Sequence, residues 1–368
     1  MSRPQKPVLA LDIAPLGERR HTGIPNVVKA LAREMLADEQ VAPKFFMQRG
    51  ETPRGIVERI LDLDSGEILW WLSGRLDARP TFAIEPGRTH AAIYAAAKRH
   101  RRLFPVEVQI VHDLTAILMP QFHTDDAVRW WRERLLVDML TSDLIVAVSH
   151  STAADIRTYF PEVGHIPCLV APLGVSVGAT PALAGKVEDY VVVLGTLEPR
   201  KNVRAVLECL SGHPDLLAET KFVFIGGWGW GETAHELVRE CGLADEIARG
   251  NLVFTGFVSN EARDALVANA RFVVYPSRYE GFGLPVLESL ALGTPVLTSF
   301  SSSLPEAGGD AADYCDFDSP DSFLAALRAM LARPRFPDAR RKEWAQGFDW
   351  TKAYRTIRDA ALGHALVD

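Results

Sequence analysis

The sequence lacks the features that mark several classes of protein. No apolar run approaches the length of a membrane-spanning helix, and the N-terminal stretch MSRPQKPVLALD does not resemble a secretory signal. The four cysteines (Cys168, Cys209, Cys241 and Cys315) include no CxxC pair, which predicts free thiols in a reducing compartment. The net charge of −7 disfavours a nucleic-acid partner. We therefore expect a cytoplasmic protein.

What the chain does contain is a long alternation of two kinds of segment. Its 368 residues, 48% hydrophobic and 24% charged, suffice for two cores. Short apolar runs alternate with longer helical patterns, which predicts parallel sheets with crossover helices. The expected strands are 8–13, 44–48, 106–113, 143–149, 189–195, 221–227, 251–256, 270–277 and 294–299. The expected helices are 25–36, 91–102, 126–140, 202–210, 233–241, 260–269, 284–292 and 321–332.

The alternation pauses at residues 170–189, which are rich in Gly, Pro and Ala and poor in charge. We interpret this segment as a linker between an N-terminal domain (1–178) and a C-terminal domain (179–347). The predicted fold class is α/β, with two Rossmann-like, doubly wound parallel-sheet domains facing each other across a cleft. Ligands of such sheets bind beyond the carboxyl ends of the strands, so the strand-to-helix loops should line the cleft.

The stretch YPSRYEGFGLPVLESLALGTPV follows this rule and carries two glutamates. Glu280 lies in the loop after a buried strand, and Glu288 lies about one turn into the next helix, whose first turn holds Pro285. Gly281 and Gly283 allow backbone N–H groups to converge near the helix N-terminus, which predicts an anion site flanked by carboxylates that accept sugar hydroxyls. Taken singly, Glu280 is equally consistent with a solvated loop residue and Glu288 with a charge favoured by the helix dipole.

Two cations form a second candidate site. Arg200 and Lys201 lie in the loop of LGTLEPRKNVRAVLECL, between a strand and a helix. Together they supply the charge that neutralises a leaving diphosphate. The alternative is a solvated basic turn.

The first half offers weaker signals. Gly23 precedes the helix that begins near Pro25, and His112 lies at the carboxyl end of a buried strand. An isolated histidine is more often structural, but its place at the strand end favours a functional role. The segment VSHSTAADI predicts a helix capped by Ser149 or Ser151.

Together these segments resemble a known family, the retaining GT-B glycosyltransferases of glycosyltransferase family 4. EGFGLPVLE resembles its E-x7-E element, GTLEPRKN its diphosphate loop and IGGWGWG its second glycine turn. TGFVSNEARDALVANARFVVYPS resembles its base-side segment, SLPEAGGDAADYCD the loop that follows, and VHDL and VSHSTAADI its first-domain elements. FDWTKAYRTIRDAAL resembles its closing helix, so the resemblance implies that 348–368 packs back on the N-terminal domain.

The resemblance implies a role for each residue of the E-x7-E segment. Glu280 is expected to hold hydroxyls of the transferred sugar, and Glu288 the ribose hydroxyls of the nucleotide. The backbone N–H groups of Phe282, Gly283 and Leu284 are expected to contact the sugar and the diphosphate.

The remaining roles concern charge and the first domain. Arg200 and Lys201 are expected to neutralise the leaving diphosphate. Thr196 stands where many family members carry Arg, which leaves more of the charge to those two residues, and we place it with the donor-binding residues. His112 is expected beneath the donor sugar, near its 6-position or the reaction centre. Gly23 should allow a loop to approach the phosphate or the acceptor.

The resemblance implies a hexosyltransferase that retains anomeric configuration by front-face attack, with a donor phosphate oxygen taking the acceptor's proton. The donor is a nucleotide diphosphate-sugar, with GDP-mannose as the first candidate and glucose, rhamnose and fucose donors left open. The acceptor is a glycan or lipid-linked saccharide in surface-polysaccharide (for example lipopolysaccharide) biosynthesis. No metal is expected. The alternatives are a 2-epimerase, a hydrolase of the same fold, and a catalytically silent nucleotide-sugar-binding subunit.

Three further patterns are set aside. Asp62-Leu63-Asp64 and Asp316-Phe317-Asp318 are DxD strings that would hold a divalent cation in a metal-dependent transferase. The basic run from Lys98 to Arg102 predicts a solvated helix end, with peripheral docking on an anionic membrane as the alternative. Trp130 and Trp131 are candidates for an acceptor platform, although we expect at least one of them in the core.

Overall fold

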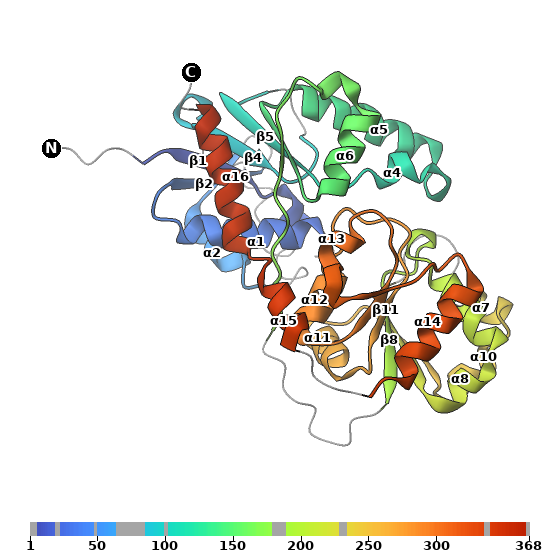
Figure 1. Cartoon of the computed structure of the whole chain (residues 1–368). Coiled ribbons are helices and arrows are strands. Elements are labelled where there is room, and N and C mark those ends of the chain that lie inside the picture. Colours follow the sequence, from blue (N-terminus) through green and yellow to red (C-terminus); the bar gives the residue numbers. More distant parts are fainter. Residues whose placement is uncertain are drawn as a thin grey trace. The chain divides into compact units, whose positions relative to one another are not determined.

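A computed structural model describes residues 6–18, 23–47, 50–63, 85–98, 102–178, 189–227, 234–334 and 339–365 (Figure 1). The chain divides into two compact units. Unit 1 comprises Met1–Gly174 and Asp349–Asp368, and unit 2 comprises Val175–Phe348. Residues 179–188 of the predicted linker lie outside the described residues. Across the described residues, no helix combines the length and the apolar character that crossing a membrane requires.

Unit 1 is built on a parallel sheet with one antiparallel edge strand. Among the described residues the strand order is β3-β2-β1-β4-β5-β6-β7, and only β3 runs antiparallel to its neighbour. The strands are β1 (Val8–Asp12), β2 (Ala42–Met47), β3 (Gly50–Thr52), β4 (Ala91–Tyr94), β5 (Val106–Val111), β6 (Leu144–Ala147) and β7 (Cys168–Val170).

Helices cover both faces of this sheet. Helix α16 packs on α1 and on the three strands from β4 to β6, whereas α5 and α6 enclose a second apolar cluster against β5 and β6. The helices are α1 (Ile24–Ala37), α2 (Arg54–Ile60), α4 (Thr115–Leu118), α5 (Asp125–Leu140), α6 (His150–Tyr159) and α16 (Trp350–Ala365). The short 3-10 helices are η1 (Ala14–Gly17), η2 (Pro86–Arg88), η3 (Pro120–Phe122) and η4 (Pro161–Val163). Ser149 caps α6 by accepting a hydrogen bond from the backbone N–H of Thr152 at 3.0 Å.

The prediction of a helix over residues 91–102 is wrong. Its first residues form β4, which lies between β1 and β5 with all four residues buried. The run AAIYAAAK has high intrinsic helix propensity, but pairing on both edges and burial on both faces override that preference.

Two surface predictions in unit 1 are also corrected. Lys98 is fully buried, where it donates hydrogen bonds to Glu107 at 3.0 Å and Ser142 at 2.8 Å, so it does not belong to a solvated helix end. Residues 99–101 of the same run lie outside the described residues. Trp130 and Trp131 are 54% and 41% exposed, so neither is a core residue.

Unit 2 contains a fully parallel sheet in the doubly wound order. Its described strands lie in the order β10-β9-β8-β11-β12-β13. They are β8 (Tyr190–Leu194), β9 (Lys221–Ile225), β10 (Leu252–Gly256), β11 (Val273–Tyr275), β12 (Val296–Thr298) and β13 (Asp313–Tyr314). In chain order this is 3-2-1-4-5-6, so the direction of winding changes between β8 and β11.

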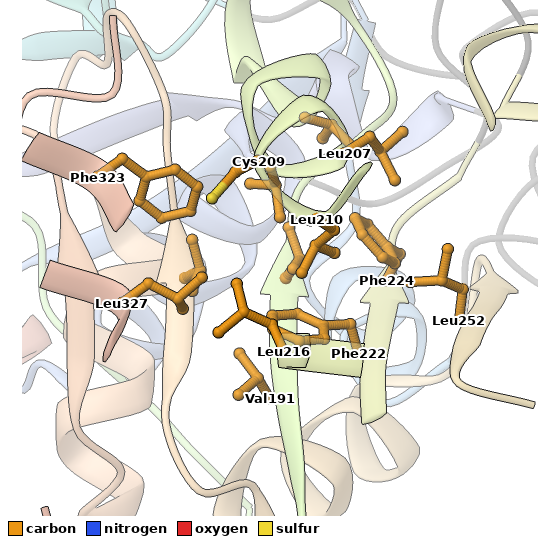
Figure 2. Close-up of a cluster of buried hydrophobic side chains, with 14 of the residues drawn as sticks. Val191, Leu207, Cys209, Leu210, Leu216, Phe222, Phe224, Leu252, Phe323 and Leu327 are labelled. Atoms are coloured by element: carbon orange, nitrogen blue, oxygen red, sulfur yellow. The ribbon is translucent and has the colours of Figure 1, made fainter. Parts of the chain in front are cut away.

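The core of unit 2 lies between this sheet and its helices. Figure 2 shows side chains of α7 and α14 pointing toward those of β8 and β9, and Figure 1 shows α11 and α12 on the other face of the sheet. The helices are α7 (Val203–Gly212), α8 (Pro214–Glu219), α9 (Ala234–Glu240), α10 (Ala244–Ala248), α11 (Asn260–Asn269), α12 (Leu284–Leu292), α13 (Leu304–Gly308), α14 (Pro320–Ala332) and α15 (Ala339–Gln346). The short 3-10 helices are η5 (Pro199–Lys201) and η6 (Gly309–Ala311).

Candidate functional site

Two loops meet at the point where the winding of the unit 2 sheet reverses. One loop follows β8 and leads through η5 into α7, and the other follows β11 and leads into α12. The backbone N–H of Arg278 donates to the carbonyl of Arg200 at 2.9 Å, so the two loops are joined directly. Doubly wound sheets bind their ligands at this position, outside the carboxyl ends of the strands.

The N-terminus of α12 presents unoccupied backbone donors. Gly283 is the N-cap, and Pro285 in the first turn has no N–H to offer. Within the described part of the chain, the N–H groups of Phe282, Gly283 and Leu284 have no acceptor. These three donors and the helix dipole favour an anion at this end of α12.

The backbone at Gly283 favours glycine. Its φ is +105°, and a Cβ atom there would lie 3.0 Å from Leu304 Cδ2 and 3.1 Å from Ala307 Cβ. The absence of a side chain therefore lets α12 begin directly against α13 and keeps the N–H groups accessible.

Glu280 is held by one of its two carboxylate oxygens. Oε1 accepts hydrogen bonds from Lys201 Nζ at 2.5 Å, Tyr275 OH at 2.8 Å and Ser277 Oγ at 2.5 Å, and lies 3.2 Å from Arg200 Nη1. Every contact that this carboxylate makes within the described residues goes to Oε1, which leaves Oε2 to accept hydrogen bonds from a ligand.

The charges in this cluster set its protonation state. Burial raises the pKa of the Glu280 carboxyl, but the charges of Lys201 and Arg200, together with hydrogen bonds, outweigh burial and lower it to about 2. Burial lowers the pKa of Lys201, and the Glu280 charge offsets part of that effect. Burial and the nearby Glu280 raise the pKa of Tyr275 well above its ordinary value. Glu280 is therefore a hydrogen-bond acceptor and Tyr275 a donor at neutral pH.

Further hydrogen bonds hold the same loop. The N–H of Glu280 donates to Ser302 Oγ at 2.8 Å, and Ser303 Oγ donates to the Glu280 carbonyl at 2.9 Å. Arg200 Nη1 donates to the carbonyl of Tyr279 at 2.7 Å, and Arg200 Nη2 donates to Glu198 Oε1 at 2.7 Å.

Sequence reasoning missed several of these supporting residues. They are Tyr275, Ser277, Glu198, Ser302 and Ser303. The only available signal is in YPS, where a tyrosine and a serine end an otherwise apolar strand two residues apart. Alternation places both side chains on one face of that strand.

Glu288 contacts a different element. Its Oε2 lies 3.3 Å from Arg263 Nη1 on α11, and Arg263 also binds Asp264 through Nε at 3.0 Å and Nη2 at 2.8 Å. Burial raises the pKa of the Glu288 carboxyl to about 7, because Arg263 offsets only part of the burial effect and Asp264 adds to it. Glu288 therefore changes charge near neutral pH, unlike Glu280.

Thr196 lies in a tightly packed part of the β8 loop. The N–H of Leu197 donates to the Gly227 carbonyl at 3.1 Å, and a Cβ atom at Gly226 would lie 2.0 Å from the Gly195 carbonyl oxygen. The β9 loop therefore packs backbone to backbone against the β8 loop. Residues 228–231 of the second glycine turn lie outside the described residues.

His112 and Gly23 belong to unit 1, which is described separately from the cluster above. His112 Nε2 lies 2.9 Å from the carbonyl oxygen of Ala95, so Nε2 carries the proton and Nδ1 is an acceptor. Burial lowers the pKa of His112, which favours the neutral ring. Gly23 is the N-cap of α1 with φ of +56°, which favours glycine even though a Cβ atom would meet no neighbour within 4 Å.

The structure thus brings three of the predicted residues (Arg200, Lys201 and Glu280) into contact. Phe282, Gly283 and Leu284 follow Glu280 in the same loop and lead into α12, and Thr196 lies in the loop that carries the two cations. Glu288 contacts Arg263 on α11 instead.

Comparison with known proteins identifies relatives for the chain. The family model described as "Glycosyl transferases group 1" matches residues 182–346. The O-antigen chain mannosyltransferase B of Escherichia coli is 30% identical over 257 residues, which cover 66% of this chain and 66% of that protein. The MMP alpha-(1->4)-mannosyltransferase of Mycolicibacterium hassiacum is 29% identical over 252 residues, 61% of this chain and 57% of that protein. The matched parts therefore span less than the full length of both relatives.

A solved structure extends the comparison to the fold of the whole chain. Sucrose-phosphate synthase from Thermosynechococcus elongatus aligns with a TM-score of 0.72 at 16% identity, over 99% of this chain and 100% of that one. At this identity the likeness concerns the fold alone, and it confirms the predicted class of two parallel-sheet α/β domains of the GT-B type.

Proposed function

The chain belongs to the group 1 glycosyl transferases through residues 182–346, and from that premise we propose that it is a retaining hexosyltransferase. It transfers mannose from GDP-mannose to a glycan or lipid-linked saccharide in the cytoplasm, during surface-polysaccharide synthesis. The choice of mannose is supported by the names of the two relatives above, both of which are mannosyltransferases.

The observation that carries the proposal is the arrangement around Glu280. Four donors engage Oε1, so the carboxylate stays ionised and fixed while Oε2 is left to accept sugar hydroxyls. The unoccupied N–H groups of Gly283 and Leu284 begin α12 three residues further along the same loop. A carboxylate that accepts hydrogen bonds from hydroxyls, beside a site that binds an anion, matches a ligand in which a sugar is joined to a diphosphate.

Charge stabilisation then drives departure of the nucleotide. The bond between the anomeric carbon and the diphosphate oxygen breaks, negative charge grows on the diphosphate, and Lys201 and Arg200 stabilise that charge. The acceptor hydroxyl attacks from the same face and gives its proton to a diphosphate oxygen, which retains the configuration. The unprotonated Nδ1 of His112 accepts a hydrogen bond from a sugar hydroxyl, and the carboxylate of Glu288 accepts hydrogen bonds from the ribose hydroxyls. No metal enters this proposal, because the two cations supply the positive charge.

Binding of nucleotides tests the proposal first. Thermal unfolding is measured with GDP, UDP, dTDP and ADP, each with and without EDTA. A diphosphate present at 100 times its dissociation constant adds about 2.7 kcal/mol of stability, which is enough to rank the four. We expect GDP to give the largest shift, unchanged by EDTA. A shift that EDTA abolishes refutes metal independence, and no shift from any of the four refutes the donor site.

Turnover separates the enzyme from a silent binding subunit. The protein is incubated with GDP-mannose and an alkyl α-mannoside, and both GDP release and the disaccharide are measured. We expect a new glycosidic bond of retained configuration, established by the one-bond carbon–proton coupling at the anomeric carbon. Tight GDP binding without hydrolysis or transfer supports the silent subunit instead.

A further inference from the structure

The loop that carries the two cations also carries an acid. Glu198 lies between Thr196 and Arg200, and its side chain is 15% exposed. Its Oε1 accepts the hydrogen bond from Arg200 Nη2 at 2.7 Å, a charge-assisted contact in a partly buried position. The guanidinium that the proposed reaction needs for the diphosphate is therefore already held by a carboxylate.

The Glu198 side chain does not cap the turn that follows it. Glu198 is the N-cap residue of η5, but its side chain makes no capping hydrogen bond to the backbone of that turn. Within the described residues Arg200 is the sole hydrogen-bond and ion-pair partner of the Glu198 side chain. The loop keeps its shape through backbone contacts instead, such as the bond from the Lys201 N–H to the Glu198 carbonyl at 3.0 Å.

The charges of the cluster balance because of this acid. Arg200 and Lys201 contribute two positive charges, and Glu198 and Glu280 contribute two negative charges. An incoming diphosphate must therefore compete with carboxylates for both cations. Glu280 has a place in the proposed reaction as the ligand of the sugar, whereas Glu198 has none.

We propose that Glu198 weakens the binding of the nucleoside diphosphate by competing for Arg200, and so speeds release of the product. The inference rests on the proposed function, in which Arg200 contacts the diphosphate. Interactions that hold the product as tightly as the transition state do not raise turnover, and product release limits the turnover of many enzymes. When Glu198 pairs with Arg200 again after the reaction, the affinity for the nucleoside diphosphate falls. Arg200 still stabilises the negative charge that develops on the diphosphate during the reaction.

The test is a gain of affinity, which misfolding cannot mimic. Dissociation constants for GDP are measured by isothermal titration calorimetry with the wild type, Glu198→Gln, Arg200→Gln and the double variant. We expect Glu198→Gln to lower the dissociation constant about fivefold, equal to ~1 kcal/mol, and to slow GDP dissociation in stopped-flow displacement. In the Arg200→Gln background the same substitution should change the constant less than twofold, because the competition no longer exists.

Glu240→Gln is the matched control. Glu240 pairs with Arg204 at 2.8 Å in the same unit, so this variant removes the same charge from a more exposed Arg–Glu pair outside the loop. We expect its GDP affinity to equal that of the wild type.

The outcomes separate the two proposals. If the wild type binds GDP and Glu198→Gln binds it equally or more weakly, Glu198 serves to orient Arg200 and this inference is wrong. An equal gain in Glu240→Gln also overturns it, because general charge then explains the effect. If the wild type binds none of GDP, UDP, dTDP and ADP, the proposed function fails and this inference fails with it.

Discussion

Removing the charge of Glu288 should stabilise the protein at alkaline pH. Burial raises the pKa of this carboxyl from 4.5 to about 7, so folding favours its protonated form. The stability it contributes is fully present below pH 4.5 and is lost as the pH rises through 7. Above pH 7 the wild type carries a buried charge that Glu288→Gln does not carry.

The structure sets the size of the effect. The difference between 4.5 and about 7, at 1.36 kcal/mol for each pH unit, gives an upper limit of about 3 kcal/mol. The amide loses the ion pair with Arg263, but Arg263 keeps both of its bonds to Asp264, so the cost of the substitution is modest. We expect a net gain of ~2 kcal/mol at pH 8, which raises Tm by about 4–8 °C.

Denaturant and thermal unfolding at pH 8 and pH 5 measure this gain. The free-energy difference between Glu288→Gln and the wild type should fall by about 2 kcal/mol from pH 8 to pH 5, because the folded wild type becomes protonated over that range. An equal difference at both pH values, or a loss of stability at pH 8, would show that Glu288 is not held above its ordinary pKa by burial.

Glu280→Gln provides the contrasting control. The pKa of Glu280 is lowered to about 2, so its contribution to stability is present above pH 4.5 and is lost as the pH falls through 2. This variant should therefore be less stable than the wild type by a similar amount at pH 8 and pH 5. Two glutamates with seven residues between them thus have pKa shifts of opposite sign, which distinguishes burial at Glu288 from ion pairing at Glu280 as the deciding cause.

Three further substitutions test the site. Lys201→Ala should reduce kcat about 10²–10³-fold in the transfer assay, because the leaving diphosphate loses a charge; unchanged turnover would contradict that role. Tyr275→Phe removes a hydroxyl that donates to Glu280 at 2.8 Å and accepts from Lys201 at 2.7 Å, and should lower the free energy of unfolding by ~1–2 kcal/mol and kcat/KM about tenfold. If the Tyr275→Phe variant keeps both the activity and the stability of the wild type, Ser277 and Lys201 suffice to hold Glu280. Gly283→Ala should cost ~2 kcal/mol of stability and weaken GDP binding in calorimetry, because φ of +105° strains any residue with a Cβ atom and that atom would crowd Ala307; normal GDP affinity would show that the α12 N–H groups are not used.

The alternation of buried strands and helices can be predicted from the sequence, because each signal lies within the segment that it describes. The strands predicted over 8–13, 106–113 and 189–195 match β1, β5 and β8 to within two residues at each end, since apolar runs buried on both faces look alike wherever they occur. Helix α12 was also predicted with both ends correct, from Pro285 in its first turn and Gly293 at its C-cap. The strand conformation of β4 could not be predicted from its own residues, because it depends on pairing with β1 and β5, which lie outside that segment.

The sequence by itself determined which loops carry the chemistry, because strand ends, glycines and charged residues lie close together along the chain. It placed Glu280, Arg200 and Lys201 at the carboxyl ends of two strands. Only the tertiary structure decided that these strands are neighbours and that the two cations and Glu280 form one cluster. It also decided that Glu280 is ionised by partners while Glu288 is held near neutrality by burial, because a pKa depends on groups close in space rather than in sequence.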